Sequence, residues 1–342
     1  MAREAADPLP DDDAPPGPSS RASPTKFSFA DLVASAKTTT KSRAAHEEGA
    51  AERAEIAASN AKLDAEKAAK VRVRVTEETA GAAGLARLFV EQADDHCMLW
   101  RAARALRPLV NKGDNAAQCQ AAGVDTAAVA ALQRFADLAS VQGQVLQLLG
   151  AVAYGSDLVR RRSGERGALA CVCRALEAFG QRDELVVLHA LTALTNLCHN
   201  SPDNRHRFLD ARGMEALVGV MEHHSAAPKV QRQGCWALLT LAGSDDTGRL
   251  VAQAGGGTVV VNAMLTHRLE AGVQQFGLWA ISNMALAGGD VTRRLRKGGC
   301  LEACRIALET HPGDAEVVRQ ARHMMSILGP PPPALKPPPK NT

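Results

Sequence analysis

The sequence predicts an all-α protein built as a solenoid of repeated helical units, and three observations lead to this prediction. One Tyr, three Trp and seven Phe occur among 342 residues, and the heavy use of Ala and Leu favours closely packed helices over strands. A glycine recurs before similar apolar segments at intervals of 43 to 46 residues. An apolar stripe with helical spacing recurs at nearly the same period, so two independent columns indicate one repeat.

The glycine column marks the turn between a short first helix and a second helix in each unit. Glycine suits this turn because it adopts a positive φ or allows another backbone to approach closely. Gly81 is a candidate for an earlier member of the column. The clear members lie 44, 46, 43 and 43 residues apart and are Gly123, Gly167, Gly213, Gly256 and Gly299.

The second column lies in the third helix of each unit. Residues one and four positions after each member are nearly all apolar, and this i, i+1, i+4 pattern is typical of the buried face of a helix. Each unit therefore consists of a polar turn, a short helix, a glycine, a second helix, a break and a third helix. The members lie 44, 44, 44, 43 and 43 residues apart and are Ala105, Leu149, Ala193, Ala237, Ala280 and His323.

Two or three helices in about 43 residues is the size class of armadillo and HEAT units. Residues 188–200, 230–243 and 273–288 resemble armadillo repeats, with the sequences LHALTALTNLCHN, VQRQGCWALLTLAG and VQQFGLWAISNMALAG. The resemblance covers residues 79–328 as five units after a partial N-terminal one. It implies a right-handed α-solenoid whose third helices line a concave groove. Pro108 and Gly150 fall in early third helices, where we expect kinks or capping units.

The resemblance also implies that the groove binds an extended peptide. In the nuclear-import branch of the family, Trp side chains form slots for Lys stems, and an Asn four residues later binds the ligand backbone. Trp279 and Asn283 form one whole pair, whereas Trp236 with Thr240 and Asn196 alone are halves of such pairs. These five residues are the predicted partner-binding site. The alternative is that the Trp side chains fill space between third helices and that the Asn amides cap backbone groups.

Both ends of the chain are expected to lie outside the solenoid. Residues 1–42 combine Pro clusters with Asp and Ser, a composition typical of a disordered arm. Residues 43–78 mix Ala with Glu, Lys and Arg, which predicts an exposed charged helix. The solenoid then covers residues 79–328. Residues 329–342 contain four consecutive prolines and predict a disordered, Pro-rich tail.

Composition disfavours several classes of protein. A net charge of +3 is small for this length, so we expect no strong attraction to nucleic acid or to an anionic membrane. The N-terminus has no signal-peptide core, and no later stretch has the length and hydrophobicity of a membrane span. We therefore expect the protein in the cytoplasm, the nucleus or both, with its eight cysteines as free thiols in the core.

Polar residues that could carry chemistry have structural interpretations. His224, His267 and His311 recur one period apart at the ends of second helices, where we expect contacts with free carbonyls rather than a metal site. The basic runs 160–162 and 293–297 are interpreted as solvated faces of first helices, the alternative being a patch for an acidic partner or nucleic acid. We expect no catalytic residue, cofactor, metal or small-molecule substrate, and hence no enzyme.

The leading functional hypothesis is a scaffold or adaptor that holds an extended segment of a partner protein in the groove. One alternative is a structural component of a larger assembly that binds through its convex edge or through the helix 43–78. Another is an adaptor of the nuclear-import kind, which would bind basic peptides and lose affinity steeply as salt increases.

Overall fold

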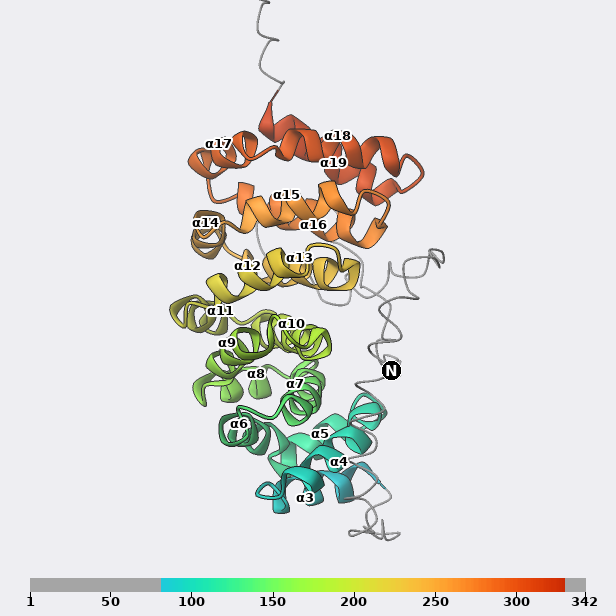
Figure 1. The fold of residues 1–342 in the computed structure, drawn as a ribbon, viewed down its shortest axis with the longest axis vertical. Helices are drawn as coiled ribbons and strands as arrows, with labels where there is room; N and C mark the ends of the chain where they lie inside the picture. Colours follow the sequence, from blue (N-terminus) through green and yellow to red (C-terminus); the bar gives the residue numbers. More distant parts are fainter. Residues whose placement is uncertain (1–80, 330–342) are drawn as a thin grey trace, which may run out of the picture.

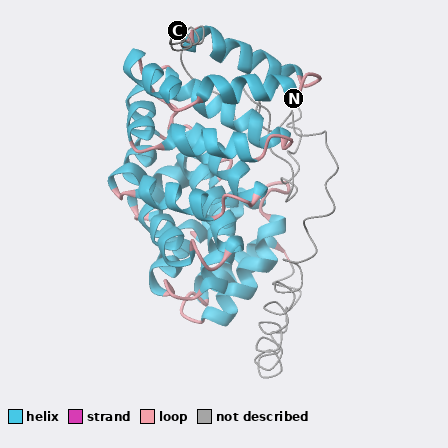
Figure 2. Cartoon of the chain, turned by 45° about the horizontal axis from the view of Figure 1, so that its top comes forward, coloured by secondary structure: helices cyan, strands magenta, loops and turns pink. Residues whose placement is uncertain are grey.

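The computed structural model describes residues 81–329, so the predicted arm 1–42, the helix 43–78 and the tail beyond residue 329 lie outside the described part. Between residues 81 and 329 the chain forms seventeen α-helices and one 3-10 helix, and no strand occurs in that range. The helices are joined by short loops (Figure 2). They stack along the long axis of the molecule in the order of the sequence (Figure 1).

The helices divide into a two-helix unit followed by five three-helix units, as the resemblance implied. The first helices are α5 (Asn115–Ala122), α8 (Asp157–Glu165), α11 (Pro202–Asp210), α14 (Asp245–Gln253) and α17 (Gly289–Lys297). The second helices are α3 (Ala82–Glu91), α6 (Val124–Arg134), α9 (Ala168–Phe179), α12 (Gly213–His223), α15 (Gly256–Thr266) and α18 (Cys300–Thr310). The third helices are α4 (His96–Leu106), α7 (Ala139–Ala153), α10 (Glu184–Cys198), α13 (Pro228–Leu241), α16 (Ala271–Ala285) and α19 (Ala315–Leu328).

The expected irregularities in the early units have local explanations. Pro108 does not kink a third helix, because α4 ends at Leu106 and the proline lies in the 3-10 helix η2 (Arg107–Leu109). Gly150 lies inside an unbroken α7. An added Cβ there would be 3.1 Å from the Cα of Ala193 on α10, so this glycine allows two third helices to approach closely.

Three members of the glycine column adopt the conformation that the turn requires. Gly123, Gly167 and Gly299 have φ values of 79°, 90° and 88°. Each of them is the N-cap of a second helix, at α6, α9 and α18. A left-handed residue at this place lets the chain reverse within one residue.

In the other two units the predicted glycine is displaced by one residue from the left-handed position. Arg212 (φ 57°) and Gly255 (φ 92°) adopt that conformation, rather than Gly213 and Gly256. Gly213 is instead needed for close packing, since an added Cβ would lie 2.4 Å from the ring of Phe208. The glycine column in the sequence therefore marks the turn correctly. It combines glycines required by a positive φ with glycines required by close packing.

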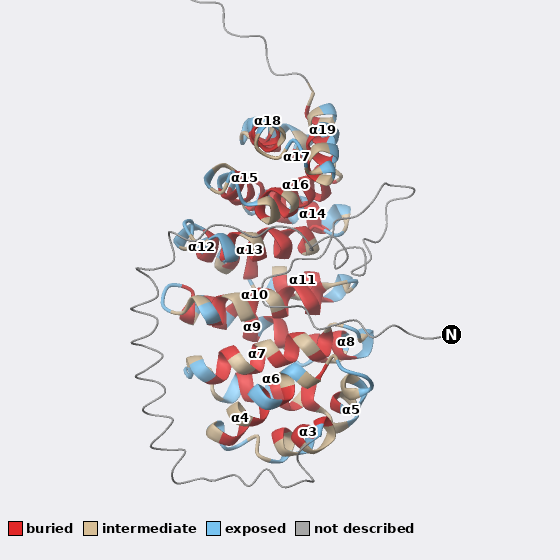
Figure 3. Ribbon diagram, turned by 90° about the vertical axis from the view of Figure 1, so that its right-hand side faces the viewer, coloured by how far each residue is buried: buried red, intermediate tan, exposed pale blue. Residues whose placement is uncertain are grey.

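One continuous apolar core runs between the helix layers from α3 to α19. Buried residues line the inward sides of all three layers (Figure 3). The core contains an aromatic cluster in which Trp236 stacks on Phe276 at 5.5 Å between ring centroids, and Phe276 meets Trp279 edge-on at 5.6 Å. None of the helices in the described range 81–329 is long and apolar enough to cross a bilayer.

A repeated glutamine ties third helices to second helices. Gln231 donates through Nε2 to the carbonyl oxygens of Met221 and His224, at 2.8 and 2.9 Å. Gln142 and Gln274 make the same pair of bonds in their own units. These bonds satisfy carbonyls at the C-terminal ends of second helices, which have no partner within the helix. The recurring Val-Gln dipeptide was the sequence signal for them, and our sequence analysis missed it.

The histidine column bonds between units. His224 and His267 are C-cap residues of second helices, as their positions predicted. Their Nε2–H groups donate to the carbonyls of Gly180 and Ser225 in the preceding unit, at 2.7 and 2.8 Å. His311 departs from the pattern, because its ring bonds to the hydroxyl of Thr310. His224 and His267 therefore link successive units of the solenoid, and the three histidines do not meet at one site.

Candidate functional site

The third helices of successive units pack directly against one another and form one layer of the solenoid. In Figure 3 this layer is turned toward the viewer, with α7, α10, α13 and α16 in sequence order. We call its solvent-facing side the third-helix face. The five predicted partner-binding residues all belong to α10, α13 and α16, which are successive helices of this layer.

The whole Trp and Asn pair is buried. Trp279 has no exposed surface, and Asn283 is 5% exposed. The indole Nε1–H of Trp279 donates to Oε1 of Glu316 on α19 at 3.2 Å, and Nδ2 of Asn283 donates to the carbonyl of Leu239 on α13 at 3.2 Å. Both side chains therefore connect α16 to its two neighbours in the layer.

Asn196 has the same role two units earlier, where it connects α10 to α7. It is 4% exposed, and its Nδ2 donates to the carbonyl of Gly150 on α7 at 3.0 Å. Its Oδ1 is buried and accepts no hydrogen bond from the described residues. These contacts correspond to the alternative interpretation, in which the Asn amides cap backbone groups between units.

Trp236 and Thr240 also contribute little surface. Trp236 is 4% exposed and stacks on Phe276 of the next unit. Thr240 is half-buried, and its hydroxyl donates to the carbonyl of Trp236 in the same helix at 3.0 Å. The structure thus brings the five residues together, and four of them are buried. Direct contact between these residues and a ligand stays a prediction.

A column of accessible positions lies one helical turn before the Trp position. The column has the same intervals as the apolar stripe, 44, 44, 44, 43 and 43 residues, and every member is half-buried. Residues at i and i+4 share a helix face, so this column borders the predicted one. We call it the accessible column, and its members are Trp100, Gln144, Leu188, Arg232, Gln275 and Val318.

The accessible column combines chemistry suited to an extended chain. Gln144 and Gln275 carry amide groups, and Leu188 has an aliphatic side chain beside Leu185, which is 57% exposed. The sequence analysis missed this column because its predicted site was based on the Trp residues, which lie four residues later in each helix. The repeat spacing alone was a sufficient signal for it.

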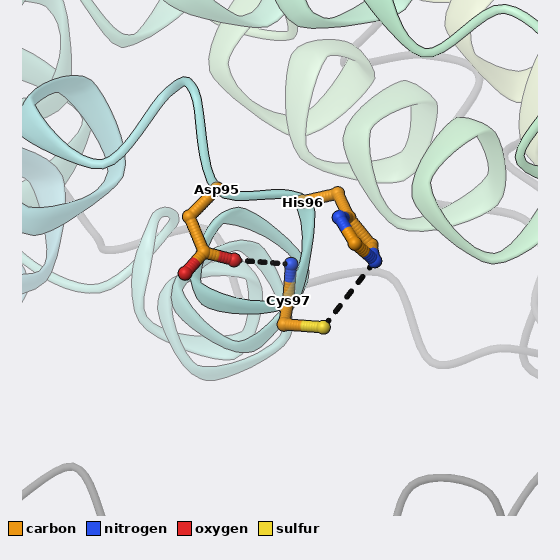
Figure 4. Close-up of side chains that lie close together, drawn as sticks. All are labelled: Asp95, His96 and Cys97. Atoms are coloured by element: carbon orange, nitrogen blue, oxygen red, sulfur yellow. Dashed lines mark hydrogen bonds between the residues drawn. The ribbon is translucent and has the colours of Figure 1, made fainter. Parts of the chain in front are cut away.

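A second cluster lies at the N-terminus of α4, where Asp95, His96 and Cys97 are adjacent (Figure 4). Their ligand-type atoms lie within 4.8 Å of one another, and a carboxylate, an imidazole and a thiol are all metal ligands. However, Asp95 is the N-cap of α4, and its Oδ1 accepts from the backbone N–H groups of Cys97 and Met98 at 2.8 and 3.1 Å. Capping accounts for this geometry, and no fourth ligand joins the group among residues 81–329.

The basic run on α8 corrects the expectation of a solvated face. Arg162 donates to both carboxylate oxygens of Asp125 on α6, with 2.5 Å between Nε and Oδ2, and Asp125 has no exposed surface. The hydrogen bond that Arg162 donates to Asp125 raises the pKa of Arg162 further above its usual value. Arg160 is buried and donates to the carbonyls of Ala153 and Tyr154 at 2.8 and 3.0 Å. These arginines join helices and do not form a surface patch.

His199, at the end of α10, is expected to make stability depend on pH. Burial, followed by the positive charge of Arg160, lowers the pKa of His199 to about 4. The unfolded chain binds a proton at about pH 6.5, so acidification from about 6.5 to 4 favours the unfolded state. In this pH range His199 lowers the free energy of unfolding by at most about 1.4 kcal/mol for each pH unit of acidification.

Denaturant unfolding of the wild type and of His199→Gln between pH 4 and 7 measures this contribution. The variant is expected to show a shallower loss of stability on acidification. His223→Gln, at an exposed position of α12, is the matched control and should follow the wild-type slope. Parallel curves for the wild type and His199→Gln would contradict the assignment.

A linear stack of two- and three-helix units around a shared core defines the class of α-solenoid proteins. No family model matches the chain, and no curated protein matches it. Among solved structures, an engineered protein from the Northeast Structural Genomics Consortium has a TM-score of 0.63 at 25% identity, covering 72% of this chain and 98% of its own.

Two further solved structures are named as armadillo repeat designs. A designed armadillo repeat protein in complex with the peptide (KR)4 has a TM-score of 0.61 at 21% identity, over 71% of this chain and 99% of its own. A computationally designed armadillo repeat protein for modular peptide recognition has a TM-score of 0.61 at 20% identity, over 70% of this chain and 98% of its own. The chain therefore has an armadillo-repeat fold.

Proposed function

We propose that this protein is a non-enzymatic scaffold that holds an extended segment of a partner protein along the third-helix face. The observation that carries the proposal is the accessible column, which offers one half-buried side chain per unit over six successive units. An extended chain that crosses the third helices meets these positions at regular intervals. Designed proteins of the same fold that are made for peptide recognition support this use of the fold.

The test replaces three members of the accessible column in the full chain, as Leu188→Ala, Arg232→Ala and Gln275→Ala. These substitutions remove surface contacts and keep strong helix formers in place. Partners are captured from native lysate and mapped by chemical cross-linking and mass spectrometry. We expect the triple variant to lose at least 90% of the captured partner while its circular dichroism spectrum is unchanged.

A matched triple variant on first helices serves as the control, with Leu158→Ala, Arg293→Ala and Arg294→Ala. All three side chains are exposed, and they lie on α8 and α17 rather than in the third-helix layer. This variant is expected to retain partners. If it loses them and the variant of the accessible column retains them, binding through an outer edge in a larger assembly replaces the proposal.

A further inference from the structure

We infer that the segment held on the third-helix face is an acidic one, with acidic residues grouped at defined intervals. This inference rests on the proposed function and adds the chemistry of the partner. It follows from the sign, the placement and the spacing of the charged side chains in the third-helix layer.

The third helices are basic although the chain as a whole is nearly neutral. Between their first and last residues they carry six Lys and Arg residues and two Glu residues, a net charge of 6 − 2 = +4, with His counted as neutral. The acidic N-cap residues Asp95, Asp183, Glu270 and Asp314 precede these bounds. The second helices carry four Arg and seven acidic residues, a net charge of 4 − 7 = −3. The two layers thus have opposite signs, and the positive one bears the accessible column.

The two acidic side chains of the third helices have structural roles. Glu316 accepts the indole N–H of Trp279 and forms an ion pair with Arg319. Glu184 occupies the first turn of α10, where a negative charge stabilises the helix dipole. Neither residue therefore converts the third-helix face into a site for a basic ligand.

The basic residues occur as three pairs, each with i, i+3 spacing, so both members of a pair project from the same side of their helix. Four of the six side chains are exposed, and Arg101 and Arg232 are half-buried. We call these the basic pairs. They lie on α4, α13 and α19 and consist of Arg101 with Arg104, Lys229 with Arg232, and Arg319 with Arg322.

The spacing of the basic pairs sets the pattern expected in the ligand. Neighbouring third helices lie about 10 Å apart, so three steps separate α4 from α13 by about 30 Å, and two steps separate α13 from α19 by about 20 Å. An extended chain advances about 3.3 Å per residue. The ligand should therefore carry acidic groups about nine and six residues apart, with neutral residues over the amide and aliphatic members of the accessible column.

The third-helix face differs in charge from the face expected of a binder of basic peptides. A solved structure of the same fold holds the peptide (KR)4, and a nuclear-import type of adaptor would bind such a sequence. The basic pairs would repel it, because like charges across an interface disfavour binding. The basic pairs therefore favour the opposite kind of ligand.

Fluorescence anisotropy with the full chain tests the inference, using labelled 16-residue peptides (DE)8, (KR)8 and (GS)8 and the oligonucleotide dT16. We expect (DE)8 to bind at least tenfold more tightly than (KR)8 or (GS)8 at 0.1 M salt. The preference should collapse at 1 M salt, where the screening length falls from about 10 Å to about 3 Å. Lys229→Ala with Arg232→Ala should weaken (DE)8 binding about tenfold, as the loss of two ion pairs with the peptide implies.

Arg293→Ala with Arg294→Ala is the matched control, because it removes the same charge from exposed positions of α17. It should change (DE)8 binding less than twofold. Equal or tighter binding of (KR)8 or dT16, or an equal effect of the two charge variants, would overturn the inference. A gain in (DE)8 affinity on replacing Asp11, Asp12 and Asp13 by Ala would also overturn it, since the chain's own acidic stretch would then be the occupant.

Different results would contradict the acidic preference and the proposed function. If (KR)8 or (GS)8 binds and the Leu188, Arg232 and Gln275 triple variant abolishes that binding, the face holds peptides but its charge preference is misassigned. If none of the peptides binds and captured partners are insensitive to the triple variant, the proposed function fails together with the inference.

Discussion

Arg162→Met is expected to lower the free energy of unfolding by about 3 to 5 kcal/mol, because it leaves a buried carboxylate without its countercharge. Asp125 has no exposed surface, and Arg162 is the residue that bonds both of its oxygens. The two residues lie on α6 and α8, in successive units, so the substitution weakens the contact between units. Denaturant unfolding followed by circular dichroism measures the change.

Two variants make this result specific. Arg134→Met breaks an exposed ion pair with Asp94, whose side chains are 56% and 81% exposed, and it should cost less than about 1 kcal/mol. Replacing Asp125 and Arg162 together by Leu and Met should recover part of the loss, since no buried charge remains. A cost below about 1 kcal/mol for Arg162→Met alone would show that the buried pair does not join the units.

Gly164→Ala is expected to destabilise the fold by about 3 kcal/mol or more, although glycine to alanine usually stabilises a helix. The added Cβ would lie 1.8 Å from Oδ1 of Asn204, which is fully buried. The Nδ2 of Asn204 donates to the carbonyls of Arg160 and Leu197 at 2.8 and 2.7 Å. Displacing this amide breaks both bonds and leaves polar groups buried without partners.

Gly219→Ala is the matched control for this experiment. Gly219 lies inside α12, and no heavy atom would come within 4 Å of an added Cβ. Alanine there should stabilise the fold by about 0.5 to 1 kcal/mol. In a double-mutant cycle, Gly164→Ala should cost much less in an Asn204→Ala background. An unchanged cost in that background would show that the clash with Asn204 is not the cause.

The sequence alone was sufficient for the repeat, the fold class and the number of units, because these depend on periodic features that one chain displays directly. A column of small and apolar residues fixes which sides of the helices meet. The glycine column was less informative at Arg212 and Gly213. A glycine can be required either by a positive φ or by a close neighbour such as Phe208, and here the two requirements fall on different residues. The spacing is the same in both cases.

The candidate site was harder to predict because it depends on contacts one whole unit away. Whether Asn196 binds a ligand or the carbonyl of Gly150 is decided by how closely α7 and α10 approach. Arg162 is a second example. Its sequence position predicts a surface residue, but it bonds Asp125 because α8 packs against α6. Periodicity identified the third-helix layer correctly. The predicted Trp positions in that layer are buried, and the accessible column lies one helical turn before them.

The bonds between units join equivalent positions in neighbouring repeats. Nδ2 of Asn204 reaches a carbonyl 44 residues earlier, Nε2 of His224 does so over 44 residues, and Nδ2 of Asn283 over 44 residues. A tandem duplication of one unit would therefore place each new donor beside a matching acceptor. Adding or removing one repeat would therefore preserve bonds of this kind, and the length of the third-helix face would change by one unit.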